Sequence, residues 1–275
     1  MKRLLIIFLF ISTQSFATIR IGIPDDVYLD FLAFMRGREI ESIDSYEDKF
    51  SRRDVVETVL ILRMLKLGGH TGKISFVPMA TYKRLLREVS SGSVDLAATS
   101  VWESDIKDHE KGPVLVNEGE FEAGIYTSHT ASKVRDLIQK AQLNSLTAVT
   151  SIHWKEDVLV LKSLDLKHIF YAPLWTSMVK LVSLKRYDFL MANLPNKENM
   201  DLIGDGYHLK VVEGVKVKLR GQRVVAYSKK APKELKDYLF KGAKILRENG
   251  EIKKAYTESG FFSHMAKHWK VLNQD

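Results

Sequence analysis

The sequence predicts an α/β protein with two similar lobes, because one αβ unit occurs in it twice. Each copy is an amphipathic helix followed by a short polar corner, an Asp and a buried apolar strand, and the copies span 82–100 and 176–193. Such a repeat indicates two lobes, each with a mixed, mainly parallel sheet flanked by helices. Ligands of α/β proteins bind in crevices at the carboxyl ends of strands. The repeat therefore predicts a ligand site between the lobes.

The first 17 residues have the pattern of a secretory signal peptide. A basic start (Met1–Arg3) precedes the apolar run 4–11, and Ser15 and Ala17 are small residues three and one before the expected cut. A membrane anchor is the alternative, which the shortness of the apolar run disfavours. We expect cleavage after Ala17 and a periplasmic mature protein.

Composition excludes several classes of function. The chain has no cysteine, so it forms no disulfide and carries no lipid on a Cys. Its net charge of +8 is spread over the chain without a basic stripe, which argues against nucleic acid as a partner. The eight His are scattered, and the chain lacks a glycine-rich phosphate loop and a nucleophile elbow. We therefore expect no metal, no cofactor and no catalytic residue.

The first lobe is expected to begin with strands 19–23, 73–77 and 94–99. Two helices fall between them. The first covers 55–67, with a capping box at Ser51–Asp54 and a stop at Gly68-Gly69, and the second is capped by Thr81. The pattern of residues 27–53 is mixed and gives no assignment.

Extended segments 113–116 and 121–127 are expected to cross to the second lobe, and segments 216–220 and 223–227 to return from it. The last helices, from Pro232 to Gly260, are then placed back on the first lobe. The expected division gives lobe 1 residues 18–122 and 225–275, and lobe 2 residues 123–224. The second lobe is expected to contain helix 132–141, strand 146–150, helix 154–164, strand 168–171 and the second copy of the repeat.

Two stretches carry a family resemblance. One is Arg223–Gly250, continued by Ile252, Tyr256 and Gly260, and the other is the turn Ser91–Ala97. In these stretches and in the order of its elements the chain resembles the class II periplasmic solute-binding proteins, in particular family 3 of the bacterial extracellular solute-binding proteins, which serves polar amino-acid transporters. The resemblance implies a monomeric two-lobe clamp, with two crossing segments as a hinge. Such a clamp closes on a small molecule and presents it to a membrane permease or receptor.

The chain departs from the family pattern where the family binds amino acids. Family members hold the ligand carboxylate with an Arg shortly after the third strand, but 100–107 contains none, and Lys107 is the nearest cation. They hold the ligand ammonium with an Asp after the second lobe's last core strand, where this chain has Asn193. The early Pro-plus-aromatic pattern is not clear at Asp25 and Tyr28. A standard α-amino acid is therefore in doubt, and a small polar or anionic organic solute is expected.

Position along the chain supplies the remaining site candidates. Trp102 follows the third strand and is either a stacking wall or a lobe-packing residue, and Ser104 is either a ligand donor or a cap. Ser151 and Trp154 flank a helix start that suits an anion, with capping and core packing as their alternatives. Arg223 precedes the strand of the second crossing and is a candidate for the missing cation. Asp95 and Asp188 are expected to fix the corners of the repeat.

The sequence is compatible with three functions. The first is a periplasmic solute-binding protein for an ABC-type transporter, and the second is a ligand-sensing subunit of a membrane receptor. The third is a dehydratase-like enzyme on the same fold, with Glu103 or Glu120 as its acid–base group. The sequence favours binding over catalysis and does not separate transport from sensing.

Overall fold

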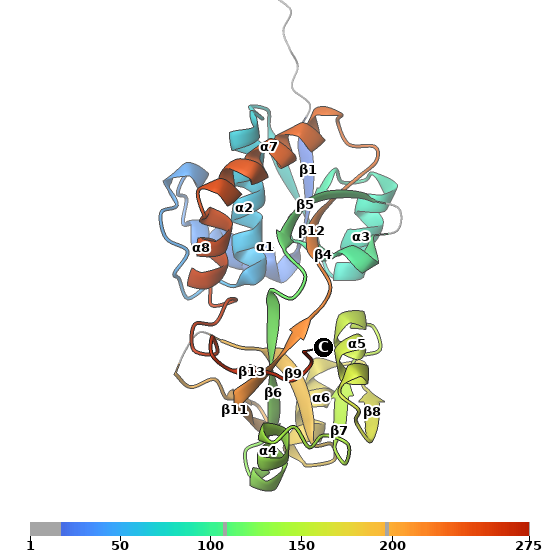
Figure 1. Ribbon diagram of the computed structural model, residues 1–275. Coiled ribbons are helices and arrows are strands. Elements are labelled where there is room, and N and C mark those ends of the chain that lie inside the picture. The colour runs from blue at the N-terminus through green and yellow to red at the C-terminus, as the bar shows by residue number, and fades with distance from the viewer. Residues whose placement is uncertain (1–17, 107–108, 196–197, 275) are drawn as a thin grey trace, which may run out of the picture.

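The computed structural model describes residues 18–106, 109–195 and 198–274, which form two lobes built on separate sheets (Figure 1). The predicted signal peptide (1–17) and Lys107 lie outside the described residues. Within the described ranges, no helix has the length and apolar character that crossing a membrane requires.

The first lobe contains a sheet in the order β2-β1-β3-β12-β4, with β5 also paired to β12. β1 is parallel to β2 and β3, whereas β12 is antiparallel to β3, β4 and β5. The strands of this sheet are β1 (Ile19–Pro24), β2 (Ile74–Met79), β3 (Leu96–Ala97), β4 (Val101–Trp102), β5 (Glu110–Val116) and β12 (Arg223–Tyr227).

Helix α2 (Arg53–Gly68) is the central helix of the first lobe and is buried along most of its length. It crosses α7 (Glu234–Glu248) where both helices carry glycine. A Cβ on Gly68 would meet the backbone oxygen of Tyr238 at 2.1 Å, so the two helices approach closely only without it. The lobe also contains α1 (Asp25–Met35), the 3₁₀ turn Ile40–Ser42, α3 (Tyr82–Ser91), the 3₁₀ turn Glu103–Asp105 and α8 (Glu251–Glu258).

The helix ends confirm two of the predicted capping signals and contradict a third. Thr81 caps α3 through a bond from the Arg84 backbone N–H, and Gly69 ends α2 in the left-handed conformation, both as predicted. The capping box at Ser51 is wrong, because the N-cap of α2 is Arg52 and it makes no side-chain cap bond. Helix α1 lies in the stretch that gave no assignment. Its N-cap is Pro24, which has no side-chain acceptor, so the usual start signal is missing.

The second lobe contains a sheet in the order β10-β11-β6-β9-β7-β8, with β13 paired to β11. β7 is parallel to β8 and β9, whereas β6 is antiparallel to β9 and β11. The elements of this lobe are β6 (Phe121–Ser128), α4 (Ser132–Gln139), β7 (Thr147–Thr150), α5 (Lys155–Ser163), β8 (His168–Tyr171), α6 (Trp175–Ser183), β9 (Phe189–Asn193), β10 (Leu202–Gly204), β11 (Tyr207–Leu219) and β13 (Lys270–Val271).

The two lobes share one plan. The strand order β2-β1-β3-β12 of the first lobe matches β8-β7-β9-β6 of the second, with three parallel strands and an antiparallel fourth in each. At the equivalent corners, Oδ2 of Asp95 accepts a bond of 2.8 Å from the Arg20 backbone N–H, and Oδ2 of Asp188 accepts one of 2.7 Å from that of Thr147. The predicted role of both Asp residues at the corners is thus confirmed.

Over the residues that the structure describes, the chain passes between the sheets three times. The first crossing joins β5 to β6 and the second joins β11 to β12, as the sequence predicted. The third follows α8 and carries the C-terminal segment to β13, which pairs with β11 (Figure 1). The expected assignment of all of 225–275 to the first lobe is therefore wrong at its end. A strand of two residues, such as β13, is too short to leave an apolar pattern that would predict this crossing.

Candidate ligand-binding site between the lobes

A cavity of about 480 Å³ lies where the two lobes meet. The first lobe contributes two cations and an indole, the crossings contribute apolar side chains, and the second lobe contributes two further indoles, an amide and one carboxyl. The lining residues are Arg53, Trp102, Phe121, Ala123, Trp154, Asp157, Trp175, Met191, Ala192, Asn193, Leu202, Leu219 and Arg223.

Ends of elements bring these side chains together. Arg53 is the first residue of α2, Trp175 is the first of α6, and Trp154 is the N-cap of α5. Trp102 at the end of β4 is the register partner of Arg223 at the start of β12. Since helix starts present free N–H groups and positive dipole ends, three of them around one cavity favour negative charge on a ligand.

Arg223 is held rigidly in the first lobe. Only 5% of it is exposed, and its Nε and Nη2 donate to Oγ and to the backbone oxygen of Ser100 at 2.9 and 2.5 Å. Its guanidinium lies over the Trp102 ring, 4.8 Å from the centroid. Burial and the neighbouring Arg53 lower the pKa of Arg223, while Glu57 and Asp54 oppose this, and a guanidinium remains charged in either case.

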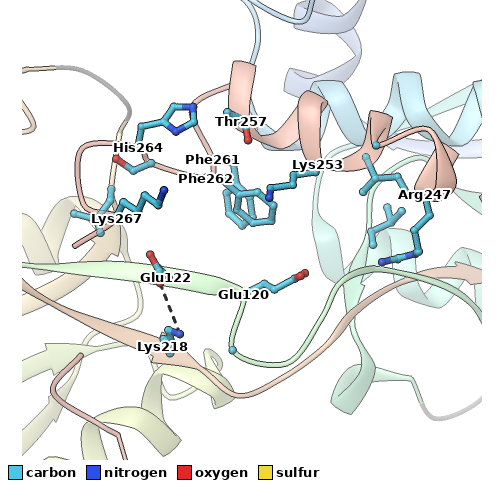
Figure 2. Close-up of a pocket in the computed structure, with 16 residues that line it drawn as sticks. Glu120, Glu122, Lys218, Arg247, Lys253, Thr257, Phe261, Phe262, His264 and Lys267 are labelled. Atoms are coloured by element: carbon cyan, nitrogen blue, oxygen red, sulfur yellow. Dashed lines mark ion pairs between the residues drawn. The ribbon is translucent and has the colours of Figure 1, made fainter. Parts of the chain in front are cut away.

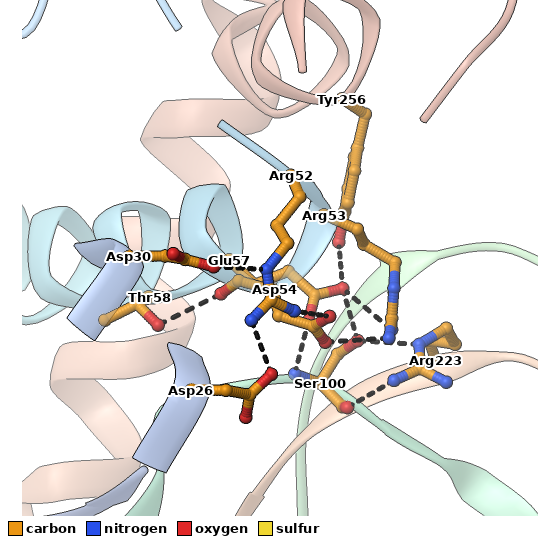
Figure 3. Close-up of polar contacts among 10 residues, drawn as sticks. All are labelled: Asp26, Asp30, Arg52, Arg53, Asp54, Glu57, Thr58, Ser100, Arg223 and Tyr256. Carbon is orange, nitrogen blue, oxygen red and sulfur yellow. Dashed lines mark hydrogen bonds and ion pairs between the residues drawn. The ribbon is translucent and has the colours of Figure 1, made fainter. Parts of the chain in front are cut away.

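Glu57 is the buried centre of this cluster (Figure 3). Its carboxylate accepts bonds from the Ser100 backbone N–H at 2.8 Å, from Ser100 Oγ at 2.6 Å and from the Tyr256 hydroxyl at 2.9 Å. The cluster thus joins α2, the turn after β3, β12 and α8 through hydrogen bonds. It fixes the position of Arg223 beside the cavity.

Arg53 keeps unused hydrogen-bonding capacity. Its Nη2 pairs with Asp54 Oδ1 at 2.7 Å, but its buried Nη1 has no hydrogen-bond partner among the described residues and lies 3.6 Å from Glu57 Oε1. Despite burial, Asp54 and Glu57 raise the pKa of Arg53. A charged donor of this kind at the cavity wall suits a carboxylate or another planar anion.

The second lobe presents aromatic rings and one unusual carboxyl. Trp154 and Trp175 lie with ring centroids 6.3 Å apart. Burial, followed by the charge of Glu156, raises the pKa of Asp157 to about 7. This side of the cavity therefore offers apolar area and a carboxyl group whose charge changes near neutral pH.

The lobes also touch beside the cavity. Lys155 Nζ pairs with Asp105 Oδ1 at 2.7 Å, and Ser104 Oγ donates to Glu156 Oε1 at 3.1 Å. Both contacts join the 3₁₀ turn after β4 to the first turn of α5. They narrow the space between the lobes at this point.

Comparison with known proteins supports the fold. No protein-family model and no curated protein matches the chain by sequence. Among solved structures, the probable amino-acid ABC transporter extracellular-binding protein ytmK of Bacillus subtilis superposes with a TM-score of 0.59 at 15% identity, covering 88% of this chain and 97% of that one. A putative ABC transporter binding component of Wolinella succinogenes complexed with lysine gives 0.55 at 17% identity, covering 90% and 97%. The periplasmic VFT2 domain of Bordetella pertussis BvgS gives 0.56 at 13% identity, covering 89% and 93%.

The chain has the type II periplasmic binding protein fold. The predicted fold class and the structural side of the resemblance are thereby confirmed. At these sequence identities the likeness concerns the fold alone. The evidence on the ligand is therefore the set of residues that line this chain's own cavity.

Four of the nine predicted site residues line the cavity of this type II fold, namely Trp102, Trp154, Asn193 and Arg223. Ser104 instead bonds Glu156 across the lobes. That any of these five residues contacts a ligand stays a prediction.

Asp25, Tyr28 and Ser151 are described by the structure and do not line the cavity. Asp25 is the first residue of α1, and the Tyr28 ring packs 5.5 Å from that of Phe76. Ser151 is buried, and its Oγ accepts a local bond from the His153 backbone N–H. Lys107 lies outside the described residues.

Sequence reasoning missed Arg53, Asp157 and Trp175, which all belong to the first turn of a helix. Arg53 carried a signal, because a cation in the first turn opposes the helix dipole and needs another reason to be there. Of the two carboxylates considered for catalysis, Glu103 pairs with Lys111, and Glu120 lines a different cavity.

Proposed function

We propose that the chain is a periplasmic solute-binding protein that captures a small polar or anionic organic solute between its lobes for an ABC-type transporter. The observation that carries this proposal is the pair Arg53 and Arg223 on one wall of the cavity, opposite Trp154 and Trp175 on the other. Two guanidinium groups suit an acidic group of the solute, and the indoles suit its apolar body. The pair takes the place of the Arg that this chain lacks after its third strand.

The proposal includes closure on the solute. A solute that contacts both walls binds more tightly when the lobes are together, so it shifts the open–closed equilibrium by the difference in its affinity for the two forms. A complex closed in this way is the form that a membrane permease would recognise.

A thermal-shift screen of amino acids, organic acids and neutral solutes tests the proposal on the mature chain. A solute at about 100 times its Kd stabilises the protein by about 2.7 kcal/mol, which is readily detected. We expect hits among solutes with an acidic group, and small-angle scattering should show a more compact protein with the hit bound.

The variant Trp154→Ala, with Tyr171→Ala as its control, tests whether the solute found in the screen binds in the cavity. Both side chains are partly exposed aromatics of the second lobe, but Tyr171 lies on β8 and does not line the cavity. We expect weaker binding only for Trp154→Ala. Hits limited to cationic solutes, or equal effects of the two substitutions, would overturn the proposal. Hits limited to neutral polar solutes would overturn the role of the two guanidinium groups in binding an acidic group.

A further inference from the structure

A second cavity, of about 650 Å³, lies beside the crossing segments (Figure 2). It is lined by the first crossing, the start of α8 and the C-terminal segment that follows this helix. The lining residues are Leu115, Gly119, Glu120, Glu122, Leu194, Lys218, Arg247, Gly250, Ile252, Lys253, Thr257, Phe261, Phe262, Ser263, His264 and Lys267. We refer to this cavity as the rear groove.

The rear groove and the cavity between the lobes lie on opposite faces of the crossing strands. In β6, Phe121 and Ala123 line the inter-lobe cavity, whereas Glu122 between them lines the rear groove. In β11, Leu219 and Lys218 alternate in the same way, and the register pairs Leu219 with Phe121 and Lys218 with Glu122. Because successive residues of a strand point to opposite faces, a rotation about the crossings that narrows one cavity widens the other.

The rear groove combines aromatic surface with unpaired positive charge. The ammonium groups of Lys253 and Lys267 reach toward the Phe261 and Phe262 rings from opposite sides (Figure 2). Neither ammonium has a hydrogen-bond or ion-pair partner within the part of the chain that the structure describes. The nearby carboxylates are already engaged, since Glu122 pairs with Lys216 at 2.7 Å and Glu120 accepts the Asn117 backbone N–H at 2.7 Å.

The two lysines belong to different lobes. Lys253 lies on α8 of the first lobe, while Lys267 lies in the C-terminal segment that is fastened to the second. The fastening is buried, because Nζ of Lys216 on β11 donates to the backbone oxygen of Ala266 at 2.8 Å. The Asn273 side chain adds two bonds to the backbone of Lys218. An anion held by both lysines would draw the lobes together on the rear side.

Phe261 connects the groove with the inter-lobe cavity. The Phe261 ring packs edge-on against that of Phe121, with ring centroids 4.8 Å apart. The Arg53 guanidinium lies 5.9 Å from the Phe261 ring centroid. Both of these neighbours line the inter-lobe cavity. A movement of Phe261 therefore displaces side chains that line the inter-lobe cavity.

We propose that the rear groove is a second ligand site, for a small organic acid with an aromatic or alkyl body, and that its occupation favours the open form of the inter-lobe cavity. The acid group bridges Lys253 and Lys267, and the apolar body lies on Phe261 and Phe262. The two sites are thus coupled with opposite sign. The binding step does not depend on the identity or existence of the inter-lobe solute.

Binding is tested with 4-phenylbutyrate by NMR titration of the ¹⁵N-labelled mature chain, with 4-phenylbutyramide and 4-phenylbutylamine as probes that differ in charge. We expect saturable chemical-shift changes at the amides around Ile252 and Phe261 with 4-phenylbutyrate, and none with the amide or the amine. The double substitution Lys253→Glu and Lys267→Glu should weaken binding at least about tenfold. The control, Lys236→Glu with Lys241→Glu on α7, makes the same charge change at exposed positions outside the groove and should leave binding unchanged.

Three outcomes of this titration would overturn the site. They are equal binding of the amide or the amine, the same affinity after both double substitutions, and shifts confined to Trp102 and Trp154, which would place the acid in the inter-lobe cavity.

Coupling is tested by the distance between the lobes. The chain has no cysteine, so Lys83→Cys on α3 and Lys162→Cys on α5 accept one spin label each, on helices that face one another across the lobes (Figure 1). Saturating 4-phenylbutyrate should lengthen the label-to-label distance, and should not do so in the Lys253→Glu, Lys267→Glu background. An unchanged or shortened distance would overturn the coupling. Because neither readout uses the inter-lobe solute, failure here and failure of the proposed function are separate results.

Discussion

The two lobes have the same strand order and the same Asp corner, yet they present opposite chemistry to the cavity between them. The first lobe contributes Arg53 and Arg223, and the second contributes Trp154, Trp175 and Asp157. All of these residues lie at ends of helices or strands. The shared plan therefore determines where a ligand site forms, and the residues at the element ends determine which ligand it accepts.

The lobes also differ in how firmly they hold these residues. The first lobe ties its cations into a hydrogen-bonded cluster around the fully buried Glu57. In the second lobe, Asp157 lies beside the like charge of Glu156 and its pKa is raised. One wall is thus preorganised for an anion, while the other provides contact area and a titratable group.

Removal of Glu57 should have the largest effect and would test this contrast directly. Glu57→Ala removes one of the two carboxylates that compensate the buried Arg53 and Arg223, and it leaves the Ser100 and Tyr256 donors without their acceptor. We expect it to lower the free energy of unfolding by about 3–5 kcal/mol. Glu156→Ala on the second lobe removes a carboxylate that is also buried and whose hydrogen-bond partner is Ser104, and should cost only about 1 kcal/mol. Urea unfolding followed by circular dichroism measures both. Equal costs would mean that the lobes do not differ in this respect.

The corners should instead behave alike. Asp95→Ala and Asp188→Ala each leave a strand N–H without its acceptor, so each should cost about 1–3 kcal/mol. Asp95 also pairs with the half-exposed Arg20, which adds little. Urea midpoints of the two variants provide the measurement. A difference of more than about 2 kcal/mol would contradict the equivalence of the two corners.

The same contrast explains what the sequence predicted and what it did not. The corners, the paired αβ units and most strands are local patterns of apolar spacing and capping, so a single sequence reveals them. Trp102, Trp154, Asn193 and Arg223 were predicted because each lies next to a strand or helix end that these patterns locate.

Arg53 and Asp157 were missed for a physical reason. Arg53 is the first residue of α2 and pairs with Asp54 and Glu57 on the same helix. The Ser100 and Tyr256 donors that hold Glu57 in place come from distant parts of the chain. Asp157 is one of several acidic residues in first turns, and the burial that, ahead of the charge of Glu156, raises its pKa comes from tertiary packing. The first-turn position of Arg53 is a local signal, but the tertiary contacts that place both residues at the cavity leave none in the sequence. The third crossing escaped prediction for the same reason.

Arg53→Lys tests the anion-binding wall. A lysine keeps the charge but loses the planar fork, so the affinity for an acidic solute should fall about tenfold. The control is Arg52→Lys, one residue away, because Arg52 pairs with Asp26 and Asp30 and does not line the cavity. Isothermal titration with a hit from the solute screen gives both affinities. Comparable losses in the two variants would place the solute elsewhere.

The smallest expected effect on affinity concerns Asp157, and its sign decides which end of a solute the second lobe holds. Because the folded pKa is about 7 and the unfolded value is about 3.9, the folded chain binds more protons between these pH values, and stability falls as pH rises through that window. Asp157→Asn should remove this slope, as thermal unfolding at pH 4 to 8 would show. For a purely anionic solute, affinity should drop by less than about tenfold above pH 7 in the unsubstituted protein and stay level in Asp157→Asn. A solute that places an ammonium group against Asp157 would instead bind more tightly above pH 7, and the substitution would weaken it. The sign of the pH dependence therefore distinguishes an acid from a zwitterion without a structure of the complex.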